Sequence, residues 1–363
     1  MEKVMQRNFG LDLLRVIACY MVVQVHVGEN YYIGAWDDVN QYSLVVNDLG
    51  GYLAGVCNSL LRISVPLFVM ISGYFLFPMK GSLSDFFRKR LTRVLVPFVV
   101  WYVLYAFYGG YVFHLGFKTI LTNILLLPVN FPMYFGHLWY VYMILGLYLL
   151  VPVLSPWLER AGKKELQIYL GIWVITLFLR YIHLLFPSVW GECYWNPSPM
   201  FHYFSGFIGY FLLGYYCKKY VGKLTLWQKW STLLMITLGL AVTMSLFLYR
   251  LGIYKGVPEV ELSWFFDTPN VAVMTLGVFL LFKDVSIKRE NFVVRVVSDM
   301  GQKSYGIYLA HIMLLYSLFP LLDPLFPIYV RILIIGVAVF VATYFLMKIL
   351  SYLPKSKYIW ISG

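Results

Sequence analysis

The sequence predicts an all-α fold: a polytopic transmembrane helical bundle of about ten spans, with both termini in the cytoplasm. Three observations carry this prediction. Of the 363 residues, 61% are hydrophobic and only 13% are charged, about half the charged share of a soluble domain. Long apolar runs recur along the whole chain, and basic residues gather between alternate runs. This composition excludes a soluble globular enzyme, which would need a charged surface.

The apolar runs give the spans in order, because a helix needs about 20 apolar residues to cross the hydrocarbon core of a bilayer. The runs cover residues 11–28, 49–77, 94–113, 137–155, 167–186, 203–217, 230–249, 269–282, 304–320 and 328–352. Those at 203–217 and 269–282 are short for a full span. The connecting segments are also short, so we expect a single integral-membrane domain over residues 1–363.

The basic residues fix the orientation and the number of crossings. With the N-terminus inside, the inner segments hold 22 lysines and arginines and the outer segments hold 3. This is the positive-inside pattern of a protein that spans a lipid bilayer. The net charge of +12 is therefore topological, and no nucleic-acid partner is expected.

The four cysteines, Cys19, Cys57, Cys193 and Cys217, form no C-x-x-C pair. Only Cys193 lies in an outer segment, so we expect neither a disulfide framework nor a zinc site. No metal is expected in the site.

The first run carries two ionisable residues that a bilayer disfavours. Arg15 and His26 are 11 residues apart, within about 20° of three full helical turns, so they share a face at about 16.5 Å of axial separation. Asp12 precedes Arg15 by three residues, and Glu29 follows His26 by three, where it could orient the imidazole. This stripe predicts one wall of a polar slot across the membrane. A snorkelling arginine and a packed histidine are the structural alternative.

Two further sets of arginines stand near the membrane. Arg62 lies deep in the second run, beside Ser64 and Pro66, which loosen the helical hydrogen-bond ladder. Arg90 and Arg93 precede the third run at a spacing of three and would suit the phosphates of a nucleotide-like ligand. A plain positive-inside cluster explains Arg90 and Arg93 equally well.

Histidines and aromatic residues mark the fourth and ninth runs. His137 and Trp139 lie at the outer end of the fourth run, and Tyr305 and His311 lie within the ninth. Aromatic residues at this depth form an interfacial belt in many membrane proteins. The functional alternative is a set of stacking and hydrogen-bonding positions for a saccharide acceptor.

Taken in order, these motifs resemble the acyltransferase-3 family of integral-membrane acyltransferases. The resemblance covers nearly the whole chain from about residue 7, and the Gly136–Trp139 form is most similar to the subgroup that O-acetylates enterobacterial common antigen. An acidic residue after the tryptophan and a C-terminal hydrolase-like domain, both found in larger members, are not seen in this sequence. The motifs are Arg15-x10-His26, Arg62 with Val65–Phe68 and Ser72–Tyr74, Arg90-x-x-Arg93 with Pro97, His137–Tyr140, and Ser304–His311.

The resemblance implies transfer of an acyl group, mostly acetyl, from cytoplasmic acyl-CoA to a hydroxyl of a surface glycan or lipid-linked saccharide, in the bacterial inner membrane. His26 would be the catalytic base or the acyl acceptor, with Arg15 as the second catalytic residue. Acetyl-CoA or another acyl-CoA would be the co-substrate, held by Arg62, Arg90 and Arg93. The acceptor would contact a further set of residues: Glu29, His137, Trp139, Tyr305 and His311.

A rival hypothesis is a transporter or flippase without acyl-transfer chemistry, in which the polar stripe binds a translocating solute or saccharide. The sequence reveals no matching pair of interrupted spans in two halves, which is the usual sign of a repeat-built transporter. The stripe on the first run and the Arg90–Arg93 pair favour the enzyme. The oligomeric state is left open.

Overall fold

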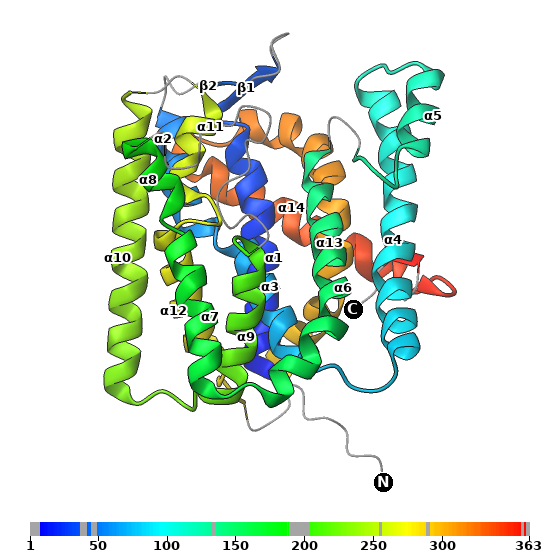
Figure 1. The fold of residues 1–363 in the computed structure, drawn as a ribbon. Coiled ribbons are helices and arrows are strands. Elements are labelled where there is room, and N and C mark those ends of the chain that lie inside the picture. The colour runs from blue at the N-terminus through cyan, green and yellow to red at the C-terminus, as the bar shows by residue number, and fades with distance from the viewer. Residues whose placement is uncertain are drawn as a thin grey trace. The chain divides into compact units, whose positions relative to one another are not determined.

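The structure, a computed structural model, describes residues 8–36, 42–44, 49–131, 135–186, 188, 204–253, 256–287, 291–356 and 359–360. These residues are almost entirely helical (Figure 1). One short antiparallel hairpin, β1 (Ile33–Trp36) and β2 (Tyr42–Leu44), interrupts the helices. The predicted all-α polytopic bundle is confirmed.

The number of spans is close to the prediction. Among the described residues, eight helices are long and apolar enough to cross a membrane. The number is nine if the bent pair Val257–Trp264 and Pro269–Phe282, with 42° between its two parts, is counted as one span. The run predicted at 203–217 becomes α9 (Phe207–Tyr220), which has 14 residues. Such a helix is about 21 Å long, shorter than the hydrocarbon core, so α9 does not cross it unaided.

The chain divides into two compact units, and each is described by itself. Unit 1 comprises Met1–Pro78 and Ser155–Lys288, and unit 2 comprises Met79–Leu154 and Arg289–Gly363. The single domain expected over residues 1–363 stays a prediction.

Unit 1 is built around the first helix, α1 (Phe9–Glu29), which packs on α2 (Leu49–Leu61), α3 (Ser64–Leu76) and α12 (Pro269–Phe282). Its other helices surround these. They are α7 (Lys163–Thr176), α8 (Leu179–Leu185), α9, α10 (Leu226–Leu251), α11 (Val257–Glu261) and the 3-10 turn η3 (Leu262–Trp264). Figure 1 shows α11 at the same end of unit 1 as the β1–β2 hairpin that follows α1.

The start of α1 is fastened to the end of α12. Asn8 caps α1 by accepting a hydrogen bond from the Leu11 amide, and its Nδ2 donates to the Lys283 carbonyl at 2.9 Å. Two residues further on, the Gly10 amide donates to the Val285 carbonyl, also at 2.9 Å. A side-chain cap that also bonds a second helix sets the register between the two.

Glycines allow α3 and α9 to pack at backbone distance. A Cβ on Gly73 would lie 1.9 Å from the Phe211 carbonyl oxygen, and a Cβ on Gly214 would lie 2.1 Å from that of Met70. No larger residue fits at either position. Close approach through small residues is how membrane helices gain packing energy where lipid supplies no hydrophobic drive.

The second span breaks between α2 and α3, at Arg62–Ile63. Pro66 causes the break, because it has no N–H to donate to the carbonyl of Arg62, four residues earlier. The irregularity predicted from the sequence is therefore present, and it lies where the Arg62 side chain leaves the helix.

Unit 2 contains α4 (Leu83–Val112), α5 (Phe117–Leu125), the 3-10 turn η1 (Gly136–Leu138), most of α6 (Trp139–Arg160), α13 (Phe292–Leu322), the turn η4 (Asp323–Leu325) and α14 (Ile328–Leu350). The helix α4 begins 11 residues before the predicted run and passes through Pro97. Ser82 caps it, accepting a hydrogen bond from the Asp85 amide. Arg90 and Arg93 are thus part of a helix rather than of a loop.

Candidate functional site

The last turn of α1 presents a close contact between the side chains of His26 and Glu29. His26 Nδ1 lies 2.6 Å from Glu29 Oε2, and each side chain is 22% exposed. The spacing of three residues brings the two side chains together on one helix face. The pairing expected from the sequence is therefore present.

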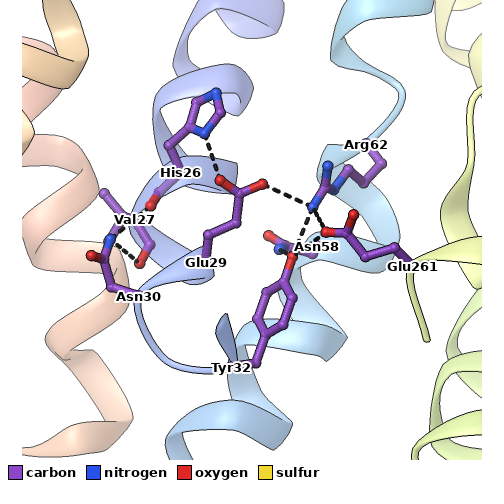
Figure 2. Close-up of polar contacts among 8 residues, drawn as sticks. All are labelled: His26, Val27, Glu29, Asn30, Tyr32, Asn58, Arg62 and Glu261. Atoms are coloured by element: carbon purple, nitrogen blue, oxygen red, sulfur yellow. Dashed lines mark hydrogen bonds and ion pairs between the residues drawn. The ribbon is translucent and has the colours of Figure 1, made fainter. Parts of the chain in front are cut away.

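The carboxylate of Glu29 also reaches beyond its own helix. Its Oε1 accepts a hydrogen bond from Arg62 Nη2 at 2.9 Å. Figure 2 shows Glu29 lying between the imidazole of His26 and the guanidinium of Arg62, with one oxygen turned to each. The break between α2 and α3 frees the backbone where Arg62 is attached, so the guanidinium can turn toward α1.

Tyr32, in the turn after α1, forms hydrogen bonds with Arg62 and with a second carboxylate. Its Oη accepts from Arg62 Nη2 at 2.7 Å and donates to Glu261 Oε1 at 2.8 Å. The side chain is fully buried, and burial raises the pKa of the Tyr32 hydroxyl well above its usual value. Tyr32 therefore stays protonated and remains a hydrogen-bond donor across the physiological range.

Glu261, which is distant from Arg62 in the sequence, completes the network. Its Oε1 lies 2.5 Å from Arg62 Nη2, although the two residues are 199 positions apart. Glu261 ends α11, and the Trp264 ring after it lies 5.6 Å from Arg62 Cζ. The sequence interpretation missed Glu261. The one available signal was a carboxylate beside a broken apolar run in a chain with only 17 acidic residues.

The His26–Glu29 contact determines the chemistry of the imidazole. An ionised carboxylate accepts hydrogen bonds only, so the proton between the two groups is carried by Nδ1. The neutral ring then has its lone pair on Nε2. A histidine held in this tautomer can take a proton from a hydroxyl or attack a carbonyl carbon.

Arg15 lies at the opposite end of α1 and belongs to a separate contact. Its Nη1 bonds Asp12 Oδ1 at 3.0 Å, and its Cζ lies 5.7 Å from the Phe75 ring. Because α1 is continuous from Phe9 to Glu29, the spacing of 11 residues keeps Arg15 and His26 on one face. The structure thus places them on one stripe, each with a carboxylate three residues away.

In unit 2 the two predicted histidines lie together. The His137 and His311 ring centroids are 5.2 Å apart, and both residues are buried. Tyr308 joins them, because its hydroxyl donates to the His137 carbonyl while its own carbonyl lies 2.5 Å from His311 Nδ1. The Tyr105 ring packs against His137 at 5.1 Å.

The remaining predicted residues of unit 2 are spread along its helices. Arg90 and Arg93 share a face of α4, and Tyr305 donates to the Val94 carbonyl, one residue further on, at 2.9 Å. Trp139 begins α6 and is 36% exposed. Their roles in binding stay predictions. Cys193 lies outside the described residues.

Comparison with protein families places nearly the entire chain in one family. The model of the acyltransferase-3 family, described as an acyltransferase domain, matches residues 8–350. No solved structure matches the chain.

Two curated proteins are similar to this chain. A protein of Bacillus subtilis named as a membrane-bound acyltransferase, YfiQ, is 24% identical over an alignment of 322 positions that covers 82% of this chain and 78% of that protein. The serine/alanine racemase of Enterococcus gallinarum is 28% identical over 181 residues. The matched region is 47% of this chain but only 23% of the racemase, so the likeness concerns a minor part of that protein.

Proposed function

Because the chain belongs to the acyltransferase-3 family of membrane acyltransferases, we propose that it is an acyl-CoA-dependent O-acyltransferase with His26 at its reactive centre. The acyl group, in the simplest case acetyl, passes from cytoplasmic acyl-CoA to a hydroxyl of a cell-surface glycan or lipid-linked saccharide. The enzyme works in the inner membrane of a bacterium.

One observation carries the proposal: the 2.6 Å contact of His26 Nδ1 with Glu29 Oε2. It leaves Nε2 as the basic ring nitrogen. In direct transfer, Nε2 takes the proton of the acceptor hydroxyl while the oxygen forms a bond to the thioester carbonyl carbon. The carbon–sulfur bond breaks, and the CoA thiolate leaves with the proton returned by the imidazolium.

The same tautomer permits transfer in two steps. Nε2 attacks the thioester, CoA leaves as the thiolate, and the acyl-imidazolium then passes its acyl group to the acceptor hydroxyl, whose proton ends on the thiolate. Incubating the protein with radiolabelled acetyl-CoA in the absence of acceptor separates the two routes. Label on the His26 peptide marks the two-step route.

The arginines divide into three proposed roles. Arg90 and Arg93 are assigned to the phosphates of CoA, because guanidinium groups bind phosphate oxygens in a fixed fork. Arg15 is assigned to orienting the acyl-CoA, as the second catalytic residue beside His26. Arg62 was predicted to join Arg90 and Arg93, but its Nη2 already contacts two carboxylates. We assign Arg62 to the support of Glu29.

The acceptor is assigned to residues with mixed aromatic and polar character. Trp139 is exposed at the start of α6 and offers a ring face to a sugar. His137, Tyr305 and His311 lie on neighbouring helices of the same unit and are proposed as its polar partners.

The test is acyl transfer by the purified protein. His26→Ala should lower the rate of acetyl transfer from acetyl-CoA by about 10² to 10⁴, the usual contribution of a general base. His114→Asn, which changes an exposed histidine of unit 2, is the matched control. Transfer by a folded His26→Ala protein at the wild-type rate would remove His26 from the mechanism.

One observation favours the rival function, transport without chemistry. The second span is broken at Arg62–Ile63, and Val257–Phe282 forms a bent pair. Interrupted helices line the solute sites of many transporters, and here they carry Arg62 and Glu261. Both breaks lie in unit 1, however, rather than one in each half. Uptake of a labelled saccharide into proteoliposomes that contain no acyl-CoA would support transport.

A further inference from the structure

Arg62 is the point at which three separate elements meet. Glu29 comes from α1, Arg62 from the α2–α3 break and Glu261 from α11. The guanidinium Nη2 lies 2.9 Å from Glu29 Oε1 and 2.5 Å from Glu261 Oε1. Together with His26, these residues form a chain of alternating groups: imidazole, carboxylate, guanidinium, carboxylate.

The two carboxylate oxygens of Glu29 contact different residues of this network. Oε2 contacts His26 and Oε1 contacts Arg62. An arginine beside a carboxylate ordinarily forms two parallel hydrogen bonds that occupy both oxygens. The contact seen here is made through one oxygen of Glu29, which leaves the other oxygen for His26.

Arg62 has the donor that a second hydrogen bond would need. Its Nε is buried and has no hydrogen-bond partner in the part of the chain that the structure describes. Nε and Nη2 lie on the same side of the guanidinium and form the fork that binds a carboxylate edge-on. Glu261 holds Nη2 from the other side, with Tyr32 bonded to both groups.

We propose that Glu261 is a positioning residue that restrains Arg62 and so keeps one oxygen of Glu29 for His26. Without its negative charge, Arg62 would close edge-on upon Glu29, draw both oxygens away from Nδ1, and leave the imidazole without its orienting partner. The inference rests on the proposed function in one respect: His26 is taken as the reactive group.

If Glu261 positions Arg62, its substitution should have an effect that loss of packing alone would not produce. Glu261→Gln should lower kcat by about tenfold, with little change in KM, although His26 and Glu29 are both intact. Removing Arg62 as well should relieve part of the loss, because nothing then competes with His26 for Glu29. The double variant Arg62→Gln/Glu261→Gln should be about threefold faster than Glu261→Gln, and slower than the wild type because Glu29 has lost its support from Arg62. If the two substitutions were independent packing defects, their losses of activity would combine, and the double variant would be slower than either single variant.

A second readout follows His26 without any acyl transfer. Diethyl pyrocarbonate modifies neutral imidazoles, and its rate at His26 can be read from peptide masses at about pH 8, where an ordinary imidazole is neutral. We expect slower modification in Glu261→Gln and recovery in the double variant. The exposed His114 serves as the internal reference.

Glu259→Gln is the matched control, because Glu259 is exposed on the same short helix, two residues from Glu261. Gel filtration of each variant checks that it is folded. A double variant as slow as Glu261→Gln, or slower, in both assays would overturn the positioning role. If the modification pattern holds while the wild type transfers no acetyl group, the positioning stands and the proposed function fails.

Discussion

The first helix carries two pairs of contacting side chains at the same spacing, an inner pair that includes Asp12 and an outer pair that includes Glu29, named for the orientation that the sequence predicts. The outer pair extends to other parts of the chain. Asp12 and Arg15 are three residues apart with 3.0 Å between Oδ1 and Nη1, and His26 and Glu29 are three apart with 2.6 Å between Nδ1 and Oε2. The inner pair includes a buried carboxylate, 7% exposed. The outer pair is 22% exposed on both sides and continues through Arg62 to Glu261.

The comparison teaches that equal spacing does not give equal function. The inner carboxylate, Asp12, bonds the arginine three residues further on and lies in the first turn, where a negative charge also suits the helix dipole. The outer carboxylate is shared between two helices, so its position depends on residues far along the chain. We expect the inner pair to act in binding and the outer pair in chemistry.

The largest effect should come from the outer pair. Glu29→Gln keeps the size of the side chain but removes the charge that holds Nδ1–H of His26. We expect kcat to fall by about 100-fold with little change in the KM for acetyl-CoA. Single-turnover transfer by the purified protein measures this. If Glu29→Gln raised only the KM for acetyl-CoA and left kcat unchanged, the outer pair would act in binding, like the inner pair.

A smaller effect of a different kind should come from the inner pair. Arg15→Gln removes one charged hydrogen-bond donor, which is worth about tenfold in the binding of an anionic ligand. We expect the KM for acetyl-CoA to rise by that factor while kcat changes less. Dephospho-CoA thioesters, which lack one phosphate, give a direct check. A loss confined to kcat would contradict the division between the ends of α1.

The smallest effect concerns stability. Tyr32→Phe deletes the hydroxyl that joins Arg62 to Glu261, and it should lower the free energy of unfolding by about 1 kcal/mol, as for a typical buried hydrogen bond. Tryptophan fluorescence during heating in detergent would show the lower melting temperature. Tyr111→Phe is the control, because Tyr111 is 81% exposed. Equal melting temperatures would mean that the outer network adds nothing to the fold.

The sequence predicted what depends on neighbours along the chain. Apolar runs located the helices, and the spacing of Asp12, Arg15, His26 and Glu29 predicted both contacts, because helix geometry fixes which side chains meet at three residues. It also predicted the irregular backbone near Pro66.

The sequence could not predict contacts that depend on tertiary packing. Glu261 meets Arg62 across 199 residues, and no local pattern distinguishes it from Glu259 two positions earlier. The early start of α4 was missed for a related reason: its first turns are polar and charged, so hydropathy alone began the helix too late.

The cap at Asn8 has a mechanical consequence. At one end α1 is tied to Lys283 and Val285, just past α12, and at the other it is tied through Arg62 to Glu261, at the end of α11. Because α11 and α12 are the two arms of one bent pair, the helix is clamped twice to the same partner. These contacts at both ends should resist sliding of α1 along its own axis, so we expect any movement around His26 to come from side-chain rotation or from displacement of neighbouring helices.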